Sequence, residues 1–500
     1  MSNAVGAPQI NVTAMAVFVF FFLLVTLMGF FAARWKRGDT KASLDEWGLG
    51  GRQFGGWITW FLIGGDFYTA YTVIAVPALV YAVGAYGFFA LPYTIIVYPI
   101  VFAIMPRVWA LAHRHGYVTA GDIVHGTYRS RGLELAVAMT GMVATMPYIA
   151  LQLVGMEVVI KALGLTGELP LIAAFIILAL YTYSSGLRAP ALIAFVKDIM
   201  IYIVVLTAVV VVPTKLGGYG HVFDVAGAAF AAKGGATGLL LKPAQMLPFA
   251  TLALGSALAA FMYPHTMTGI LAARSGDTVR RNAIYLPAYT IVLGLIALLG
   301  YMGYAAAIKV SSPNDVVPAL FNALFPSWFA GFAFAAIAIG ALVPAAVMSI
   351  GASNLFTRNV WKAYVDPTIS PSGEAKVAKI ASLVVKLGAL AAVLFLPTQF
   401  ALDLQLLGGM IIIQIFPAIV FGLFGRFFLA GGLLTGWAVG IVWGCWVVFG
   451  DGLKPVHVFK FGNNSYGIYV GLAALVLNVV VAAIVSAVQR AAGAQPVAAE

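Results

Sequence analysis

A carboxyl group inside an apolar stretch is the first feature of this sequence that suggests chemistry. Asp66 follows Gly64 and Gly65 in the run WFLIGGDFYTAYT. The hydroxyl-bearing residues that come directly after it are Tyr68, Thr69, Tyr71 and Thr72. An Asp at the centre of a membrane-spanning helix costs roughly 2.5–3.5 kcal/mol, while paired glycines favour a local break whose freed backbone groups hold a ligand. We interpret Asp66 as part of a binding site; the simpler interpretation, that it only caps the break, stays open.

A second apolar stretch, LALGSALAAFMYPHTMTGI, has a related pattern. We expect Gly255 and Ser256 near the middle of the membrane, with Tyr263, Pro264 and His265 nearer the inside. Interrupted helices at corresponding places in two halves of a transporter point to a binding site at the midplane. This signal is weak by itself, because Gly is frequent in spanning helices.

Two adjacent charges, Lys197 and Asp198, lie in a third apolar stretch, RAPALIAFVKDIMIYIVV. Lys197 comes eight residues after Ala189, which places it about 12 Å along the helix axis. One interpretation is that the Lys197 side chain extends to the inner surface while Asp198 pairs locally. The other is that both act within the membrane, as ionisable residues there often do.

Composition identifies the elements that must position these residues. Hydrophobic residues make up 62% of the 500-residue chain and charged residues only 9%, with a mean hydropathy of +0.99. A soluble protein carries roughly 25% charged residues, so we predict an all-α membrane protein. Thirteen apolar runs approach the roughly 20 residues that a spanning helix needs. They are 12–33, 55–76, 84–106, 133–161, 169–187, 189–213, 246–272, 282–308, 328–356, 377–397, 401–424, 427–449 and 464–488.

The basic residues predict the orientation and exclude some functions. Most of the 28 Lys and Arg residues fall in loops that lie on one side if the N-terminus is outside and the tail 489–500 is cytoplasmic. The net charge of +11 is therefore no sign of nucleic-acid binding. The longest expected loop, 214–245, is too short for a soluble domain, and no P-loop is present. The single cysteine, Cys445, excludes an internal disulfide.

Several motifs resemble the sodium/solute symporter family over nearly the whole chain. They are GGDFYTAYTVIAVP, YIALQLVG, YTYSSGLRAPALIAFVKD, YPHTMTGILAARS, ASNLFTRNVWKAY and IIIQIFPAIVFGLFGR. Within that family the chain is most similar to bacterial monocarboxylate permeases of the inner membrane. Their solutes are short acids such as lactate, pyruvate and propionate, with alanine as an outlying candidate.

The resemblance implies one transporter domain with two inverted repeats of five helices, 55–213 and 246–424. One extra helix with a basic loop, 12–54, precedes them, and two helices, 427–488, follow. The solute would be held between the broken helices and exposed to each side in turn. A small carboxylate needs no intramembrane arginine where freed N–H groups face it. The expected solute-binding residues are Gly65, Asp66, Tyr68, Thr69, Tyr71, Gln152, Gly255 and Ser256.

The sequence departs from the family at the sodium site. The resemblance implies backbone carbonyls, here those of Gly64 and Phe67, together with two hydroxyl groups and an acid from other helices. The hydroxyl positions fall on Val343 and Pro344, and the acid position falls on Ala194. Sodium is coordinated by oxygen ligands, and these side chains have no oxygen atom. If the alignment of this helix with the family is shifted, Ser349 and Ser353 would supply the hydroxyl groups.

Lys197, one turn beyond Ala194, would bring its ammonium group near those carbonyls. We therefore expect proton coupling rather than sodium coupling, with Lys197 or Asp66 carrying the proton. The expected partners are a monocarboxylate, the coupling cation and the lipid bilayer, with no nucleic acid, resident metal, cofactor or obligate protein partner. Alternatives are a sodium-coupled symporter of proline or a vitamin, and a passive channel or facilitator. An enzyme is disfavoured, since no metal-binding motif such as HExxH is present.

Overall fold

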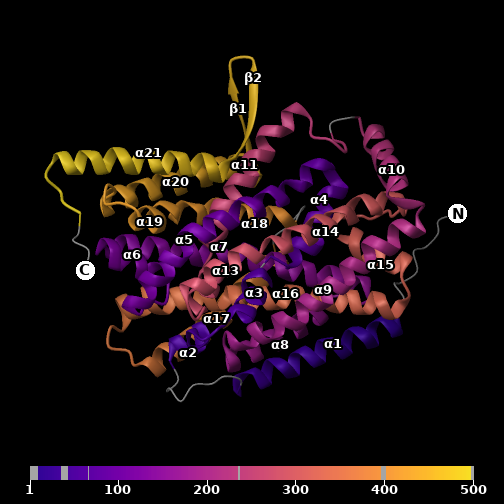
Figure 1. Ribbon diagram of the computed structural model, residues 1–500, viewed down its shortest axis with the longest axis horizontal. Helices are drawn as coiled ribbons and strands as arrows, with labels where there is room; N and C mark the ends of the chain where they lie inside the picture. Colours follow the sequence, from indigo (N-terminus) through magenta and orange to yellow (C-terminus); the bar gives the residue numbers. More distant parts are fainter. Residues whose placement is uncertain (1–9, 35–42, 66, 235–236, 396–400, 497–500) are drawn as a thin grey trace.

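The computed structural model describes residues 10–34, 43–65, 67–234, 237–395 and 401–496. Ten helices among these residues are long and apolar enough to cross a membrane, and two shorter apolar helices span Tyr71–Val83 and Leu169–Ser185. The helices run side by side along the long axis of the molecule, and α1 begins at the end opposite to that at which α21 ends (Figure 1). The chain is therefore a multi-pass, predominantly helical membrane protein, as its composition predicts.

The helices of the first half are α1 (Val12–Phe31), α2 (Leu44–Leu49), α3 (Gly56–Gly65), α4 (Val76–Val83), α5 (Ala90–His115), α6 (Ala120–Tyr128), α7 (Arg131–Ala162), α8 (Leu169–Ser185), α9 (Arg188–Lys215) and α10 (Gly218–Ala232). Those of the second half are α11 (Pro243–Ala260), α12 (Pro264–Ala272), α13 (Gly276–Tyr285), α14 (Pro287–Ala305), α15 (Val316–Leu324), α16 (Ser327–Leu355), α17 (Pro371–Phe395), α18 (Ala401–Ile412), α19 (Phe416–Val420), α20 (Ala430–Gly450) and α21 (Val470–Ala491). The strands are β1 (Val456–Phe461) and β2 (Asn464–Tyr469). Tighter 3₁₀ turns span Ala32–Arg34, Gly50–Arg52, Ala85–Phe89, Pro313–Asp315, Ile413–Ile415 and Phe421–Leu423, and π-helical turns span Tyr71–Ala75 and Phe356–Val365.

Two expected segments differ from the structure. The expected loop 214–245 contains the helix α10, because its Ala and Phe residues form an apolar face in which Val222, Ala226 and Phe230 are buried. The expected run 464–488 starts too early. Residues 464–469 instead pair with β1 in an antiparallel hairpin, which projects from the bundle in Figure 1. Apolar and polar side chains alternate within VHV and FKF at 456–461, and this strand pattern is not detected by an apolar window.

Two long helices are interrupted. The first stops at Gly65 and resumes with the π-helical turn at Tyr71. The second stops at Ala260 and resumes at Pro264, which occupies the first position of α12. Proline suits that position, because the first N–H of a helix has no partner within the helix.

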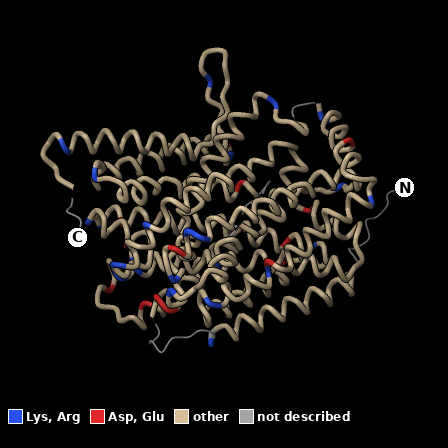
Figure 2. The backbone as a smooth tube through the Cα atoms, in the orientation of Figure 1, with Lys and Arg blue, Asp and Glu red and all other residues tan. Residues whose placement is uncertain are grey.

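Charged residues are scarce across the middle of the bundle and most are gathered toward the end at which α21 ends (Figure 2). At that end Asn359 donates to both Asp122 and Glu134 at 2.9 Å, and Arg358 donates to Glu374 at 2.9 Å. These contacts join α6, α7 and α17 to the π-helical turn that follows α16. The Arg-Asn pair of the FTRN motif therefore ties several helices together at one end of the bundle.

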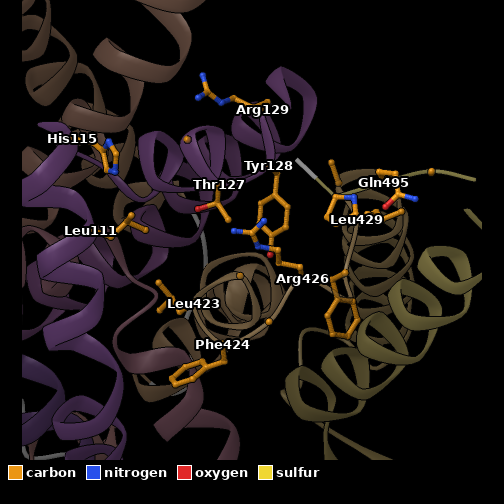
Figure 3. Close-up of a pocket in the computed structure, with 18 of the residues that line it drawn as sticks. Leu111, His115, Thr127, Tyr128, Arg129, Leu423, Phe424, Arg426, Leu429 and Gln495 are labelled. Atoms are coloured by element: carbon orange, nitrogen blue, oxygen red, sulfur yellow. The ribbon is translucent and has the colours of Figure 1, made fainter. Parts of the chain in front are cut away.

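A cavity of about 950 Å³ opens at the same end, between the last turn of α5, the end of α6, the segment 422–431 and the end of α21 (Figure 3). None of the residues expected to bind solute or coupling ion lines it.

Candidate functional site

The centre of the candidate site is the interruption between α3 and α4, where Lys197 of α9 reaches the chain. The Lys197 Nζ atom donates to the backbone oxygens of Gly65 at 2.6 Å and Tyr68 at 2.9 Å. It also forms an ion pair with the Oδ1 atom of Asp198, 2.9 Å away. Both charged side chains are 0% exposed. Three acceptors therefore face the three protons of one ammonium group, and the side chain does not extend to the inner surface.

Asp198 connects this ammonium group to another helix. Its Oδ2 atom accepts a hydrogen bond from the hydroxyl of Tyr289, on α14, at 2.7 Å. The hydroxyl of Tyr68 donates in turn to the backbone oxygen of Tyr289 at 3.2 Å. One network of charges and hydroxyl groups thus joins the interruption to α9 and to α14.

The two glycines before the interruption allow these close approaches. A Cβ atom on Gly64 would lie 2.2 Å from the ring of Tyr289, and one on Gly65 would lie 3.0 Å from the Lys197 Nζ atom. Contacts below 3.0 Å force neighbouring atoms to shift, and the ring of Tyr289 is fully buried. The glycine pair therefore provides space for the tyrosine and lysine as well as a site for the break.

Other side chains satisfy the backbone groups that the interruption frees. Gln152, on α7, accepts from the N–H of Ala70 at 3.0 Å through its Oε1 atom. Thr69 accepts from the N–H of Tyr71 at 3.0 Å, and the hydroxyl of Thr72 donates to the backbone oxygen of Phe67. Buried backbone groups need such partners. Gln152 and Thr69, expected to contact solute, hold the unwound segment in this conformation.

The carbonyls expected to hold a coupling ion differ from those that the ammonium group uses. The Gly64 oxygen accepts from the N–H of Phe67, and the Phe67 oxygen is taken by Thr72. The next carbonyl along the chain in each case, that of Gly65 and that of Tyr68, faces Lys197. The carbonyls that face Lys197 are thus one residue later than those expected. Sequence spacing does not predict this difference, because the backbone between α3 and α4 is irregular. Asp66 lies outside the described residues.

The expected sodium side chains belong to two helices, α9 and α16, that approach the same carbonyls. A Cβ atom on Gly340 of α16 would lie 3.8 Å from the Tyr68 oxygen. Val343 and Pro344 come one turn later on that helix, and Ala194 comes one turn before Lys197, so each shares a face with a residue at the interruption. All three are buried. The three positions at which the family resemblance implies side-chain oxygen ligands therefore carry apolar groups, and the ammonium group of Lys197 comes from one turn beyond Ala194.

The serines that a shifted alignment would use belong to a different contact. The Ser349 hydroxyl donates to the Ala346 oxygen at 2.8 Å and lies 3.1 Å from the hydroxyl of Ser382 on α17. Lys386, also 0% exposed, donates to Ser382 at 2.8 Å. Ser353 donates to the Ile350 oxygen of its own helix. Ser349 therefore faces α17, which excludes it as a ligand at the interruption.

The second interruption lies later in the chain than the sequence predicts. Gly255 and Ser256 belong to the continuous helix α11, and a Cβ atom on Gly255 would lie 2.4 Å from the ring of Tyr469. Gly255 therefore allows close packing against the start of α21. The chain unwinds instead at residues 261–263, where the hydroxyl of Thr266 lies within hydrogen-bond distance of the backbone oxygens of Ala260, at 2.7 Å, and Tyr263, at 2.9 Å. The proline at position 264 was the signal for this boundary.

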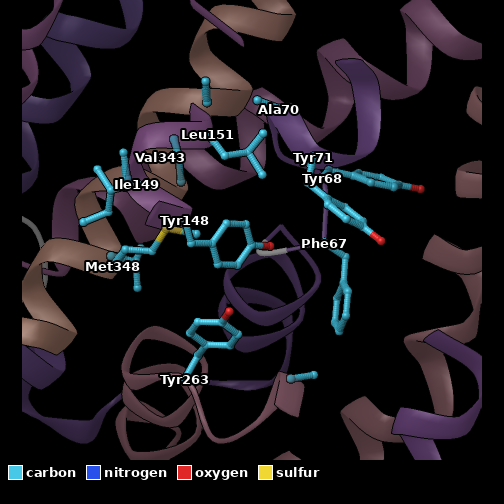
Figure 4. Close-up of a cluster of buried hydrophobic side chains, with 14 of the residues drawn as sticks. Phe67, Tyr68, Ala70, Tyr71, Tyr148, Ile149, Leu151, Tyr263, Val343 and Met348 are labelled. Atoms are coloured by element: carbon cyan, nitrogen blue, oxygen red, sulfur yellow. The ribbon is translucent and has the colours of Figure 1, made fainter. Parts of the chain in front are cut away.

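Aromatic residues from both interruptions are gathered in the region of Figure 4, where Tyr148 and Tyr263 lie near each other, and the rings of Tyr68 and Tyr71 point away from them. The rings of Tyr148 and Tyr263 are 5.3 Å apart. The hydroxyl of Tyr71 is buried without a hydrogen-bond partner among the described residues.

The hydroxyl of Ser256 and the Nδ1 atom of His265 are among the other buried polar atoms that lack such a partner within the described chain. His265 is 2% exposed, and its ring lies 5.4 Å from that of Tyr148. Unpartnered polar groups in an aromatic, buried setting are suited to hold a small solute with a polar end. His265 belongs to the second stretch singled out from the sequence, whereas Tyr148 was not predicted as a contact of this region, because its approach to His265 depends on the packing of α7 against α12.

Comparison with known proteins identifies relatives of this chain. Residues 47–442 match the model of the sodium:solute symporter family. A monocarboxylate transport permease protein of Rhizobium johnstonii is 70% identical over 96% of this chain and 97% of its own length. An uncharacterized symporter of Bacillus subtilis is 33% identical, covering 98% of this chain and 96% of the relative. The structure of a Na⁺-coupled sialic acid symporter in a substrate-bound, outward-open state superimposes with a TM-score of 0.78 at 16% identity, covering 98% of this chain and 99% of that one, which shows a shared fold.

Proposed function

Because this chain belongs to the sodium:solute symporter family, we propose that it imports short monocarboxylates together with protons across the inner membrane of a bacterium. The observation that carries the coupling proposal is the ammonium group of Lys197, which bonds to two carbonyls of the interrupted helix. Unwound carbonyls of such helices coordinate the coupling cation in transporters of this kind. A lysine that gains and loses a proton provides a cation at that place without sodium.

The cycle follows from the contacts of Lys197. In its charged form the ammonium group attracts the carbonyls of Gly65 and Tyr68 and the carboxylate of Asp198. Loss of the proton removes the charge that strengthens these bonds. The interrupted helix is then held less firmly against α9, and the site is able to open toward the other side. Proton binding and release are thereby linked to the orientation of the solute site.

The monocarboxylate proposal has separate support. The 70% identical relative is named a monocarboxylate transport permease. A solute of this class has one carboxylate and a small body, which suits hydroxyl donors among aromatic rings. The buried hydroxyl of Tyr71 and the groups of Ser256 and His265 that lack described partners are the donors we assign to it. A sodium-coupled symporter of another solute, such as proline, is the competing function, because a relative of Staphylococcus aureus with 22% identity is named a sodium/proline symporter.

Uptake of labelled lactate into liposomes tests this proposal. The reconstituted protein is given an inward pH gradient without sodium, or an inward sodium gradient at constant pH, with the voltage controlled in both. We expect accumulation with the first gradient only, and block by pyruvate or propionate but not by proline or glucose. Accumulation driven by sodium alone would reject proton coupling. Equilibration without accumulation under either gradient would indicate a facilitator.

A further inference from the structure

The cavity at the end of α5 is lined by basic side chains from three separate segments. They are Arg107, Arg114 and His115 of α5, Arg129 after α6, and Arg426 in the segment before α20. None of the described residues that line the cavity is acidic. The side chains of Arg107, Arg114 and Arg426 form no ion pair with a described carboxylate. Such a concentration of positive charge favours an anionic occupant.

Two polar atoms in the wall also lack a partner. The hydroxyl of Tyr128 and the Oε1 atom of Gln489 are buried and make no hydrogen bond to any described residue. Of the two, only the Tyr128 hydroxyl is able to donate to an anion, because an amide oxygen only accepts. Both residues line the cavity, and Figure 3 shows Thr127, Tyr128 and Arg426 pointing into it. Burial raises the pKa of Tyr128, so its hydroxyl stays protonated and is able to donate. A buried donor without a partner costs free energy, and a bound anion would supply the missing acceptor.

Part of the remaining wall is apolar and borders exposed apolar side chains. Leu111, Phe424 and Leu429 line the cavity, and the guanidinium of Arg107 lies 4.5 Å from the ring centre of Phe424. Phe424 is 54% exposed and Val488, on the neighbouring helix α21, is 63% exposed. The mouth of the cavity therefore opens beside apolar side chains at the ends of spanning helices. A soluble anion gains nothing from such a border, whereas a lipid places its acyl chains there.

The segment that carries Arg426 is held in place. Arg490 of α21 donates to the backbone oxygens of Phe427, at 2.9 Å, and of Arg426. A Cβ atom on Gly422 would lie 2.7 Å from the hydroxyl of Tyr128, so this glycine lets the segment close against α6. The walls of the cavity are thus formed by four segments that contact one another, namely α5, α6, residues 422–431 and α21.

We propose that this cavity binds the phosphate-bearing headgroup of an anionic phospholipid, with Arg114, Arg426 and Tyr128 as its principal contacts. Basic pockets between spanning helices on the cytoplasmic side commonly take such headgroups, and the basic loops assign this end of the bundle to the cytoplasm. The bound lipid ties α5, α6 and α21 together at a place apart from the solute site.

Native mass spectrometry of the purified protein in detergent tests the proposal, with phosphatidylglycerol as the probe and phosphatidylcholine as the uncharged comparison. One cation near an anionic lipid contributes a factor of about five in affinity. The variant Arg114→Gln/Arg426→Gln is therefore expected to bind phosphatidylglycerol roughly 25-fold more weakly. Tyr128→Phe, which leaves every cation in place, is expected to weaken binding several-fold.

The matched control is Arg34→Gln/Lys376→Gln, which removes two exposed cations, one at the end of a 3₁₀ turn and one in the first turns of α17, that are expected on the same side but lie outside the cavity. We expect it to retain phosphatidylglycerol, and we expect millimolar inorganic phosphate not to displace the lipid. Equal loss of lipid in the control, equal retention of phosphatidylcholine, or displacement by phosphate would overturn the proposal. Because the readout is binding, these outcomes are independent of which solute or ion is transported.

Discussion

The Nζ atom of Lys197 lies 2.6 Å from the backbone oxygen of Gly65, a residue 132 positions earlier in the chain. The ammonium group is 0% exposed, and its nearest counter-charge is the carboxylate of the next residue, Asp198. A buried ion pair of this kind is weak evidence for stability, because desolvation offsets much of the attraction. A functional role therefore explains its presence inside the membrane better than a structural one.

Removal of Lys197 alone should be more harmful to stability than removal of both charges. Lys197→Met leaves the Asp198 carboxylate buried without its cation, which costs about 3–5 kcal/mol. The double variant Lys197→Met/Asp198→Asn removes the unpaired charge and should recover most of the loss. Thermal unfolding in detergent measures the difference, with Lys376→Met as a control for loss of an exposed lysine. If Lys197→Met were as stable as the parent protein, the Asp198 carboxylate would not depend on Lys197 for charge compensation, and this account of the ion pair would be contradicted.

Gly64→Ala should impair both folding and transport. The added methyl group meets the ring of Tyr289 at 2.2 Å, and overpacking of a buried site costs about 1–3 kcal/mol. Gly56→Ala in the same helix is the matched control, since nothing lies within 4 Å of its added atom. Melting temperature and lactate uptake are measured for both. Equal behaviour of the two variants would contradict the close contact between α3 and α14.

Gln152→Leu should destabilise the interrupted helix. It leaves the N–H of Ala70 buried without its acceptor, and such a loss costs about 1–3 kcal/mol. Gln405→Leu is the comparison, because the Oε1 atom of this buried glutamine accepts no hydrogen bond from a described residue. Protease sensitivity near the interruption and the melting temperature report the effect. A larger loss in Gln405→Leu would argue against the capping role of Gln152.

Two tyrosine variants separate solute binding from stability. The Tyr71 hydroxyl has no partner among the described residues, whereas the Tyr68 hydroxyl donates to Tyr289. Tyr71→Phe should therefore keep the melting temperature but raise the KM for lactate roughly tenfold, the value of a hydrogen bond to a charged group. Tyr68→Phe should lower stability by about 1 kcal/mol. An unchanged KM for Tyr71→Phe would remove that hydroxyl from the solute site.

The sequence predicted the features that depend on composition and on distance along one helix. The low charge content required a membrane protein, and the depth of Lys197 along its helix required a partner. The glycine pair before Asp66 marked the first interruption. Each of these follows from the cost of polar groups in lipid, which acts on a segment without reference to its neighbours.

Features that depend on packing between distant segments could not be predicted in the same way. The carbonyls that face Lys197 belong to Gly65 and Tyr68, one residue later than expected, because the unwound backbone has no fixed period. Gly255 resembled a break but packs against Tyr469. The aromatic region around Tyr148 and His265 combines helices whose contact no local pattern encodes.

Proton entry during pyruvate uptake decides whether the Lys197 ammonium serves as the coupling cation. Liposomes without sodium, containing a trapped pH indicator, are supplied with external pyruvate, and the signal of protein-free liposomes is subtracted. We predict acidification of the lumen with the parent protein and none with Lys197→Met/Asp198→Asn. Pyruvate entry that requires sodium and carries it inward, with no acidification beyond that of protein-free liposomes, would contradict this mechanism.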